Sequence, residues 1–182
     1  MVNKLVILDR DGVINRDAPE GILALETFVF LPRAIDAMVM LSQAGYQLAI
    51  CTNQSAVGRG RLSPATLEAI HHHLQQTVIN AGGTAPRIYV APDLPEAPTE
   101  RRKPGAGMLR EALADAGAHA ADTFMIGDML RDLQAAHAAG CKKILVRTGK
   151  GAHTEANGIP EALQPVHICD ELFAAAAYIL AH

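Results

Sequence analysis

The sequence predicts an α/β protein, a doubly wound, Rossmann-like three-layer sandwich around a parallel sheet. Two observations support this fold class. Apolar runs of strand length alternate five times with amphipathic segments of helix length along the 182 residues, which is the pattern of successive strand–helix–strand units. The first run, at 5–8, contains no polar residue, as expected of a strand that helices cover on both faces.

Local signals place the elements in the first part of the chain. The strand at 5–8 is followed by an irregular stretch at 16–31. A helix is expected to begin at Pro32, because proline suits the first turn of a helix. Gly45 is expected to end that helix, and a second strand follows at 46–51.

The same signals recur further along the chain. Ser63 and Pro64 are typical of an N-cap and a first helical position, so the next helix begins there. A proline-rich loop at 92–102 leads to a helix that we expect Lys103 and Pro104 to open. The other expected elements are strands at 87–91, 123–126, 143–146 and, at the edge of the sheet, 166–169, with helices at 130–139 and 171–180.

Length and composition restrict the class of protein. The chain is expected to form one domain, 1–182. A net charge of −3, the absence of Trp, and only four Phe and three Tyr argue against a nucleic-acid partner. No apolar run approaches the ~20 residues of a membrane span, and the N-terminus lacks a signal pattern. Three scattered cysteines argue against a disulfide framework, so we expect a cytoplasmic protein and a monomer.

Two carboxylates, Asp9 and Asp11, directly follow the first strand, and Gly12 then permits a sharp turn. Residues two apart in an extended chain point the same way, so both acids are expected at the carboxyl end of the strand, where open α/β sheets bind ligands. Two anions this close repel each other unless a cation lies between them. The pair therefore predicts a divalent metal, and oxygen ligands favour magnesium.

Other strand ends carry matching polar groups. The second strand leads into Thr52 and Asn53, and the fourth into Asp128, with Asp132 one helical turn later. Lys103 follows the third strand. A nucleophile, a proton carrier, a metal and donors for phosphoryl oxygens are the components that phosphoryl transfer requires.

Each component has a candidate residue. Asp9 is expected to attack phosphorus, and Asp11 to protonate the leaving group and then deprotonate water. Asp9, the backbone carbonyl of Asp11, and Asp128 are expected to hold magnesium. Thr52 and Asn53 are expected to donate to the phosphoryl oxygens and Lys103 to neutralise them, with Asp132 as a partner of the metal or of Lys103.

Four motifs in order make the chain resemble a known family. They are DRDGVIN at 9–15, TNQS at 52–55, RKP at 102–104, and GD at 127–128 with Asp132; AVGRG at 56–60 and VRTGK at 146–150 also match. The chain resembles the haloacid dehalogenase superfamily of phosphatases. Within it, the chain is most similar to the D-glycero-D-manno-heptose 1,7-bisphosphate phosphatase family, which is itself similar to the histidinol-phosphate phosphatases.

The resemblance implies a function and a set of site residues. It implies magnesium-dependent removal of the 7-phosphate of a heptose bisphosphate through an aspartyl phosphate, in the synthesis of heptose nucleotides and cell-surface polysaccharide precursors. It implies Asp9, Asp11 and Asp128 at magnesium. The substrate-binding residues that we expect are Asp17, Thr52, Asn53, Gln54, Ser55, Arg59, Arg102 and Lys103.

The chain departs from the family pattern at three places. Relatives usually carry a zinc loop before the Arg-Lys-Pro motif, but residues 90–98 contain no Cys or His, so we expect no zinc. Residues 18–20 do not keep the usual His-Gly-Tyr pattern, and Met129 stands where a Lys often follows the acidic metal ligand. These departures leave the exact sugar and its anomer open.

Superfamily members often carry a separate cap domain, but the intervals from Asp11 to Asn53 and from Asn53 to Lys103 are filled by expected helices and strands. No cap fits, so loops are expected to define the pocket. Basic residues of these loops are candidates for binding a second, distal phosphate of a small sugar substrate: Arg59, Arg61, Arg101 and Arg102.

Two alternative functions remain. One is a phosphatase with the same mechanism acting on another small ester, such as histidinol phosphate. The other, from a different class, is a phospho-accepting signalling domain, against which the acid at Asp11 argues. The run His71-His72-His73 is interpreted as a solvated helix surface, because successive helical residues point about 100° apart and three in a row cannot converge on one ion.

Overall fold

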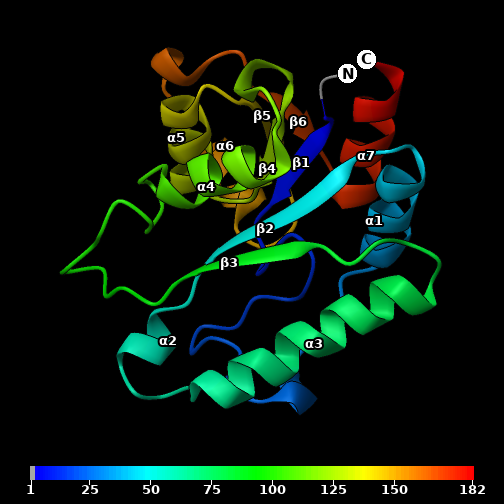
Figure 1. Ribbon diagram of the computed structural model, residues 1–182. Helices are drawn as coiled ribbons and strands as arrows, with labels where there is room; N and C mark the ends of the chain where they lie inside the picture. Colours follow the sequence, from blue (N-terminus) through cyan, green and yellow to red (C-terminus); the bar gives the residue numbers. More distant parts are fainter. Residues whose placement is uncertain (1–2) are drawn as a thin grey trace.

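The computed structural model describes residues 3–182, and its strands form a parallel sheet in the order β3-β2-β1-β4-β5-β6 (Figure 1). The order reverses direction between β1 and β4, which makes the carboxyl ends of these strands the place where such sheets bind ligands. The strands are β1 (Leu5–Leu8), β2 (Gln47–Asn53), β3 (Arg87–Ala91), β4 (Phe124–Gly127), β5 (Lys142–Val146) and β6 (His167–Cys169).

Helices cover both faces of the sheet, which confirms the three-layer α/β fold. α1 and α7 lie on one side of β1 and α4 and α5 on the other (Figure 1). The helices are α1 (Ala34–Gln43), α2 (Ser55–Gly58), α3 (Pro64–Asn80), α4 (Gly107–Ala116), α5 (Leu130–Ala139), α6 (Gly151–Ala156) and α7 (Leu172–Ala181), with short 3-10 turns η1 (Leu25–Thr27), η2 (Ala120–Asp122) and η3 (Glu161–Leu163).

The apolar run of β1 explains why two layers form. Successive strand residues face opposite sides, so Val6 and Leu8 pack into the core under α1, α3 and α7, while Leu5 and Ile7 pack under α4 and α5. All four side chains are buried. β1 lies between β2 and β4 in the middle of the sheet, so the residue that follows it, Asp9, lies in the middle of the sheet edge.

Two helices begin later than the sequence suggests. α1 begins at Ala34 rather than at Pro32, because Arg33 has a left-handed backbone (φ 58°) and its guanidinium lies over the Phe173 ring of α7. α4 begins at Gly107 rather than at Lys103. Residues 103–106 form a turn instead, in which the Gly107 amide donates to the Glu100 carbonyl (2.8 Å).

Two other differences concern the surroundings of the site. β2 is longer than expected, because Thr52 and Asn53 continue the ladder opposite Val90 and Ala91 of β3. The short helices α2 and α6 were not predicted from the sequence, since each is too short to show a helical period. The remaining expected elements agree with the structure to within one residue at most of their ends, and β6 lies at the edge as predicted. Within 3–182, none of the helices is both long and apolar enough to cross a membrane.

Helix α3 gives the clearest test of the local signals. Ser63 is its N-cap, and the Ser63 hydroxyl accepts a hydrogen bond from the Thr66 amide (3.0 Å). We expect Ser63→Ala to lower the free energy of unfolding by about 1 kcal/mol, because one helical amide loses its partner. Urea unfolding monitored by circular dichroism measures this change. Ser63→Asp keeps an acceptor and should retain wild-type stability, so equal losses in both variants would contradict this account of the helix start.

Candidate active site

Side chains from distant parts of the sequence meet at the carboxyl ends of β1, β2 and β4. Asp9 follows β1 directly, and its backbone amide donates to the Ile126 carbonyl of β4 (2.9 Å). Thr52 lies near the end of β2, and Asp128 follows β4. All three side chains are buried. The predicted convergence of polar strand ends is therefore present.

A buried ammonium group lies at the base of this site. The Lys103 Nζ atom is 2.9 Å from Asp9 Oδ1 and 2.7 Å from Asp132 Oδ1, and the side chains of Lys103 and Asp132 are fully buried. Burial disfavours the charged amine, but the two carboxylates outweigh it, so the pKa of Lys103 lies above its ordinary value. Lys103 is therefore a permanent cation beside Asp9.

Asp132 is positioned by the start of α5. Its Oδ2 atom accepts a hydrogen bond from the Met129 amide (3.0 Å), which leaves Oδ1 for Lys103. Gly127, the last residue of β4, packs against Asp132 so closely that a Cβ atom at position 127 would collide with the Asp132 side chain. Of the two partners that the sequence suggests for Asp132, the metal or Lys103, these contacts show Lys103.

Asp128 has the surroundings of a cation ligand. Its Oδ2 atom accepts from the Lys150 amide (2.8 Å), whereas its Oδ1 atom is buried without a hydrogen-bond partner. Gly12 and Gly149 leave room for this carboxylate, since a Cβ on either would collide with it. Burial, and then the charges of Asp9 and Asp132, raise the pKa of Asp128 to about 8. A buried anion with one unpartnered oxygen is costly unless a cation binds it.

The donor set fits a divalent metal ion. Oxygen atoms of Asp9, Asp128 and Asp132 lie within 4.8 Å of one another. Burial raises the pKa of Asp9 to about 6, although the Lys103 ammonium opposes this shift. Three buried carboxylates around one cation, Lys103, leave an excess of negative charge, and carboxylate oxygens are the ligands that Mg²⁺ prefers.

Asp11 is held differently from Asp9. Its Oδ1 atom accepts from Arg10 Nη2 (2.8 Å) and Asn15 Nδ2 (2.9 Å), and its Oδ2 atom accepts from Gln54 Nε2 (2.8 Å). Burial would raise the pKa of Asp11, but the Arg10 charge and these donors outweigh it and hold the pKa below its ordinary value. Both oxygens of its carboxylate thus accept from side chains of the protein.

Arg10 and His71 are site residues that the sequence reasoning missed. The Arg10 side chain is completely buried, and its Nη1 atom lies 3.1 Å from His71 Nε2 of α3. Burial, and then the Arg10 charge, lower the pKa of His71 to about 4, so a neutral His71 accepts this hydrogen bond. The Phe28 ring lies beside the same guanidinium, 5.6 Å from its carbon atom.

The interpretation of the three histidines as a solvated surface is therefore wrong for His71 and right for His72 and His73, which are exposed. The signal was available in the sequence. His71 lies four residues after Leu67 and three before Leu74, on the buried stripe of α3.

Two of the predicted substrate-binding side chains, Asn53 and Gln54, are engaged within the protein. The Asn53 amide pairs in both directions with the Lys103 backbone, donating to its carbonyl (2.9 Å) and accepting from its amide (3.0 Å). Gln54 donates to Thr52 Oγ1 (2.9 Å) as well as to Asp11. Asn53 therefore fixes the turn that carries Lys103, and Gln54 joins the ends of β1 and β2.

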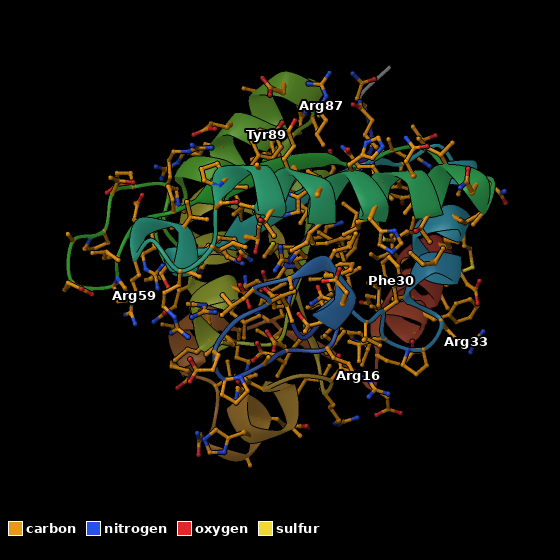
Figure 2. The ribbon with its side chains drawn as sticks, turned by 90° about the horizontal axis from the view of Figure 1, so that it is seen from below. Arg16, Phe30, Arg33, Arg59, Arg87 and Tyr89 are labelled. Carbon is orange, nitrogen blue, oxygen red and sulfur yellow. The ribbon has the colours of Figure 1, made fainter. Side chains whose placement is uncertain are left out.

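A cavity of about 320 Å³ opens above these groups. Asp17, Ser55 and Arg59 lie on its wall as expected, and Figure 2 shows Arg59 beside α2 on the side of the loop between β3 and α4. Its charged lining consists of Asp11, Asp17, Glu20, Arg59, Arg61, Asp128, Arg131 and Lys150. Arg102 is not part of this lining, and Arg101 pairs with Glu111 of α4 (2.8 Å).

The loop that follows β3 is closed by its own side chains. The Asp93 carboxylate accepts from the Thr99 amide (2.7 Å) and from the Thr99 hydroxyl. Arg102 Nη1 donates to the Asp93 carbonyl (2.9 Å). The loop also contacts α2, since a Cβ on Gly58 would collide with the Pro92 carbonyl. Polar contacts thus hold this loop beside the cavity.

The His71 contact makes a stability prediction. His71→Ala leaves Arg10 Nη1 buried without a partner, which should lower the free energy of unfolding by about 1.5–3 kcal/mol. His72→Ala, on the exposed side of the same helix turn, should stay within about 0.5 kcal/mol of wild type. Urea unfolding of both variants tests this. Similar losses in the free energy of unfolding for the two variants would contradict the role of His71 as the partner of Arg10.

The acidic cluster makes a prediction for the metal-free protein. Because the pKa values of Asp9 and Asp128 are raised, the folded state holds protons that the unfolded chain releases above about pH 4. The free energy of unfolding should therefore fall as the pH rises from about 5 to about 8.5. Mg²⁺ should raise the melting temperature more at about pH 8.5 than at about pH 5.5, because it competes with protons for the carboxylates. Differential scanning fluorimetry checks both effects.

Asp128→Asn is the control for this cluster. It removes one anion, so the decline with pH and the response to Mg²⁺ should both shrink. Stability of the metal-free wild type that increases over this pH interval, or a Mg²⁺ response equal in Asp128→Asn and wild type, would contradict the description of the cluster.

Comparison with known proteins agrees with the geometry. A family model described as "HAD-hyrolase-like" matches residues 100–175. The chain is 40% identical to the D-glycero-β-D-manno-heptose-1,7-bisphosphate 7-phosphatase of Pseudomonas aeruginosa, with 99% of each chain covered. It is 38% identical to the enzyme of the same name from Bordetella bronchiseptica, over 97% of this chain and 98% of that one.

Solved structures give the same result. The D,D-heptose 1,7-bisphosphate phosphatase from B. bronchiseptica, in a crystal structure complexed with magnesium and phosphate, superimposes with a TM-score of 0.92 at 38% identity over 98% of both chains. The corresponding phosphatase from Burkholderia thailandensis gives a TM-score of 0.76 at 35% identity, covering 98% of this chain and 99% of that one. From these relatives, together with the buried acidic cluster at the strand ends, the chain belongs to the D-glycero-D-manno-heptose 1,7-bisphosphate 7-phosphatase family of haloacid dehalogenase-like hydrolases.

Proposed function

We propose that this chain hydrolyses the 7-phosphate of D-glycero-D-manno-heptose 1,7-bisphosphate, with Mg²⁺ as cofactor and Asp9 as the nucleophile. The observation that carries the proposal is the placement of Asp9 beside a buried Lys103 ammonium, next to a cavity that Asp11 and Asp128 line. This arrangement combines a nucleophile, a proton carrier and positive charge at one point.

The contacts of Asp9 assign different roles to its two oxygens. Asp9 Oδ1 accepts from the Arg10 amide (2.8 Å) and lies 2.9 Å from Lys103 Nζ. Oδ2 has neither of these partners, so we assign it the attack on phosphorus. The bond from Oδ2 to phosphorus forms as the bond from phosphorus to the sugar oxygen breaks, which gives an aspartyl phosphate and an alkoxide.

Asp11 is the proposed proton carrier. It protonates the leaving alkoxide in the first half-reaction and takes a proton from the attacking water in the second. Its lowered pKa suits the second role. For the first role it must hold a proton, and Gln54, which donates to Asp11 Oδ2, would have to release that oxygen as substrate binds.

The remaining groups bind the phosphoryl oxygens. Thr52 and Lys103 are the proposed donors of the side-chain contacts. A magnesium ion held by Asp9, Asp128 and the Asp11 backbone carbonyl would neutralise charge on the phosphoryl group. The Asn53 side chain is occupied by the Lys103 backbone, so we assign it the positioning of Lys103 rather than a direct contact with phosphate.

The cavity wall is the proposed sugar-binding surface. Asp17 and Ser55 offer an acceptor and a hydroxyl to the sugar, and Arg59 offers a cation. Arg102 holds the loop after β3 through the Asp93 carbonyl, and we propose that it adds positive charge from beneath that loop. We also propose that the whole chain, 1–182, forms one catalytic domain.

In the proposed reaction the product keeps its 1-phosphate. Nucleotidyl transfer to a sugar requires such a phosphate, so the product would serve as a precursor in the synthesis of cell-surface polysaccharides. We also propose that the enzyme acts as a monomer in the cytoplasm. Its three cysteines are free and buried, which suits a reducing compartment.

Phosphate release from a panel of esters tests the function. We expect the β anomer of heptose 1,7-bisphosphate, for which the relatives are named, to give the highest kcat/KM. The α anomer, histidinol phosphate and a simple hexose monophosphate should be at least about 10-fold slower, a difference of about 1.4 kcal/mol in transition-state binding. Comparable kcat/KM values for every ester would contradict the assignment of a heptose bisphosphate as the substrate but not the proposed mechanism.

Asp9→Asn is the control for mechanism. It retains the shape of the side chain but lacks the nucleophile, so phosphate release should fall by about 10³-fold or more. Chelation of Mg²⁺ should have a similar effect on the wild type. Substantial activity of Asp9→Asn on the bisphosphate would exclude the aspartyl phosphate.

A further inference from the structure

The basic residues on the cavity wall differ in whether an acid neutralises them. Arg61 pairs with Glu20, and Lys150 Nζ lies 4.0 Å from Asp17. Arg59 and Arg131 also line the cavity. Within residues 3–182, neither guanidinium has an acidic side chain within 4 Å. The wall therefore presents two cations that no protein anion neutralises.

Arg131 is the better placed of the two. It lies in the first turn of α5, between the acids Asp128 and Asp132, and its side chain is half-buried, whereas Arg59 is exposed. Its Nε atom is buried without a hydrogen-bond partner. A buried donor without a partner is unfavourable, so a ligand that accepts from Arg131 would satisfy a group that the protein leaves open.

Other charges around Arg131 also favour an anion. Burial, and then the charge of Arg131, lower the pKa of Arg102, and Arg59 contributes to the same shift. Arg131 and Arg59 therefore each lie close enough to Arg102 to repel it. Guanidinium groups bind phosphate in a two-pronged manner and are favoured at phosphate sites. A bound dianion would relieve this repulsion.

Arg131 and Lys103 differ in burial and in place, although the charge of Arg131 also acts on Asp9, where it opposes the rise in pKa. Lys103, the cation beside Asp9, is fully buried at the base of the site, whereas Arg131 lies on the wall of the cavity above it, together with Arg59. Lys103 and the metal provide the charge for one phosphoryl group, so the wall cations remain for a second one.

We propose that Arg131 binds the phosphate that stays on the sugar, the 1-phosphate, and so makes the enzyme select bisphosphates over monophosphates. The inference rests on the proposed function, because it takes the 7-phosphate to be the group over Asp9. It adds a specificity residue that was not among those predicted from the sequence, where the candidates for a distal phosphate were Arg59, Arg61, Arg101 and Arg102.

Binding and turnover of two matched ligands test the proposal: heptose 1,7-bisphosphate and heptose 7-phosphate. We expect Arg131→Met to lower kcat/KM for the bisphosphate by about 10–100-fold, as for loss of a charged hydrogen bond. For the 7-phosphate, kcat/KM should change by less than about 3-fold. Calorimetric titration in the Asp9→Asn background, which does not turn over, should show the same selective loss in affinity.

Matched variants make the result specific. Arg110→Met removes an exposed arginine of α4 outside the cavity and should leave both ligands unaffected. Met129 lines the same cavity as Arg131, so Met129→Lys added to Arg131→Met should restore part of the bisphosphate preference. Arg131→Gln, which keeps hydrogen-bonding groups and removes only the charge, replaces Arg131→Met if melting curves show that the latter is unfolded.

The outcomes distinguish this inference from the proposed function. Equal losses for both ligands would place Arg131 at the reacting phosphate and overturn the inference, while phosphatase activity stands. No change for either ligand would also overturn it. A wild type that hydrolyses neither ligand would instead overturn the proposed function, and the calorimetric arm alone would then report whether Arg131 binds a second phosphate.

Discussion

The Lys103 ammonium between Asp9 and Asp132 is the interaction on which the site depends. Three acids, including Asp128, share one buried volume at the ends of β1 and β4, and anions at this density repel one another in a medium that screens poorly. Lys103 is the cation of the protein that compensates them directly. Its place is set by Asn53, which holds the Lys103 backbone from the end of β2.

A second buried cation, Arg10, connects the site to the helical layer. Its guanidinium bonds to Asp11 on one side and to His71 of α3 on the other. A charge buried this deeply is stable only when its hydrogen bonds are satisfied. The packing of α3 on the sheet therefore also determines the orientation of Asp11, and a helix without contact to the substrate contributes to the geometry of the proposed proton carrier.

The proposed catalytic residues and the proposed substrate-binding residues lie at different depths in the protein. Asp9 and Asp128 directly follow buried strands, where the backbone is fixed by the parallel ladder, and Asn53 at the end of β2 holds the turn that carries Lys103. The groups that we propose for substrate binding, such as Arg59 and Asp17, line the cavity. The loop after β3 is held by Asp93, Thr99 and Arg102, so hydrogen bonds fix a loop whose sequence has no Cys or His.

The sequence by itself determined the fold class, the strands, and the acids and lysine at the strand ends. These depend on local signals, such as the apolar run before Asp9 or the cap at Ser63, and on the rule that parallel strands end together. The tertiary structure alone decided which partner each polar group takes. Arg10 lies between Asp9 and Asp11 and Arg131 between Asp128 and Asp132 in the sequence, yet one is buried against His71 and the other lines the cavity. Such pairings depend on distances between residues far apart in the chain, which arise only when the layers pack.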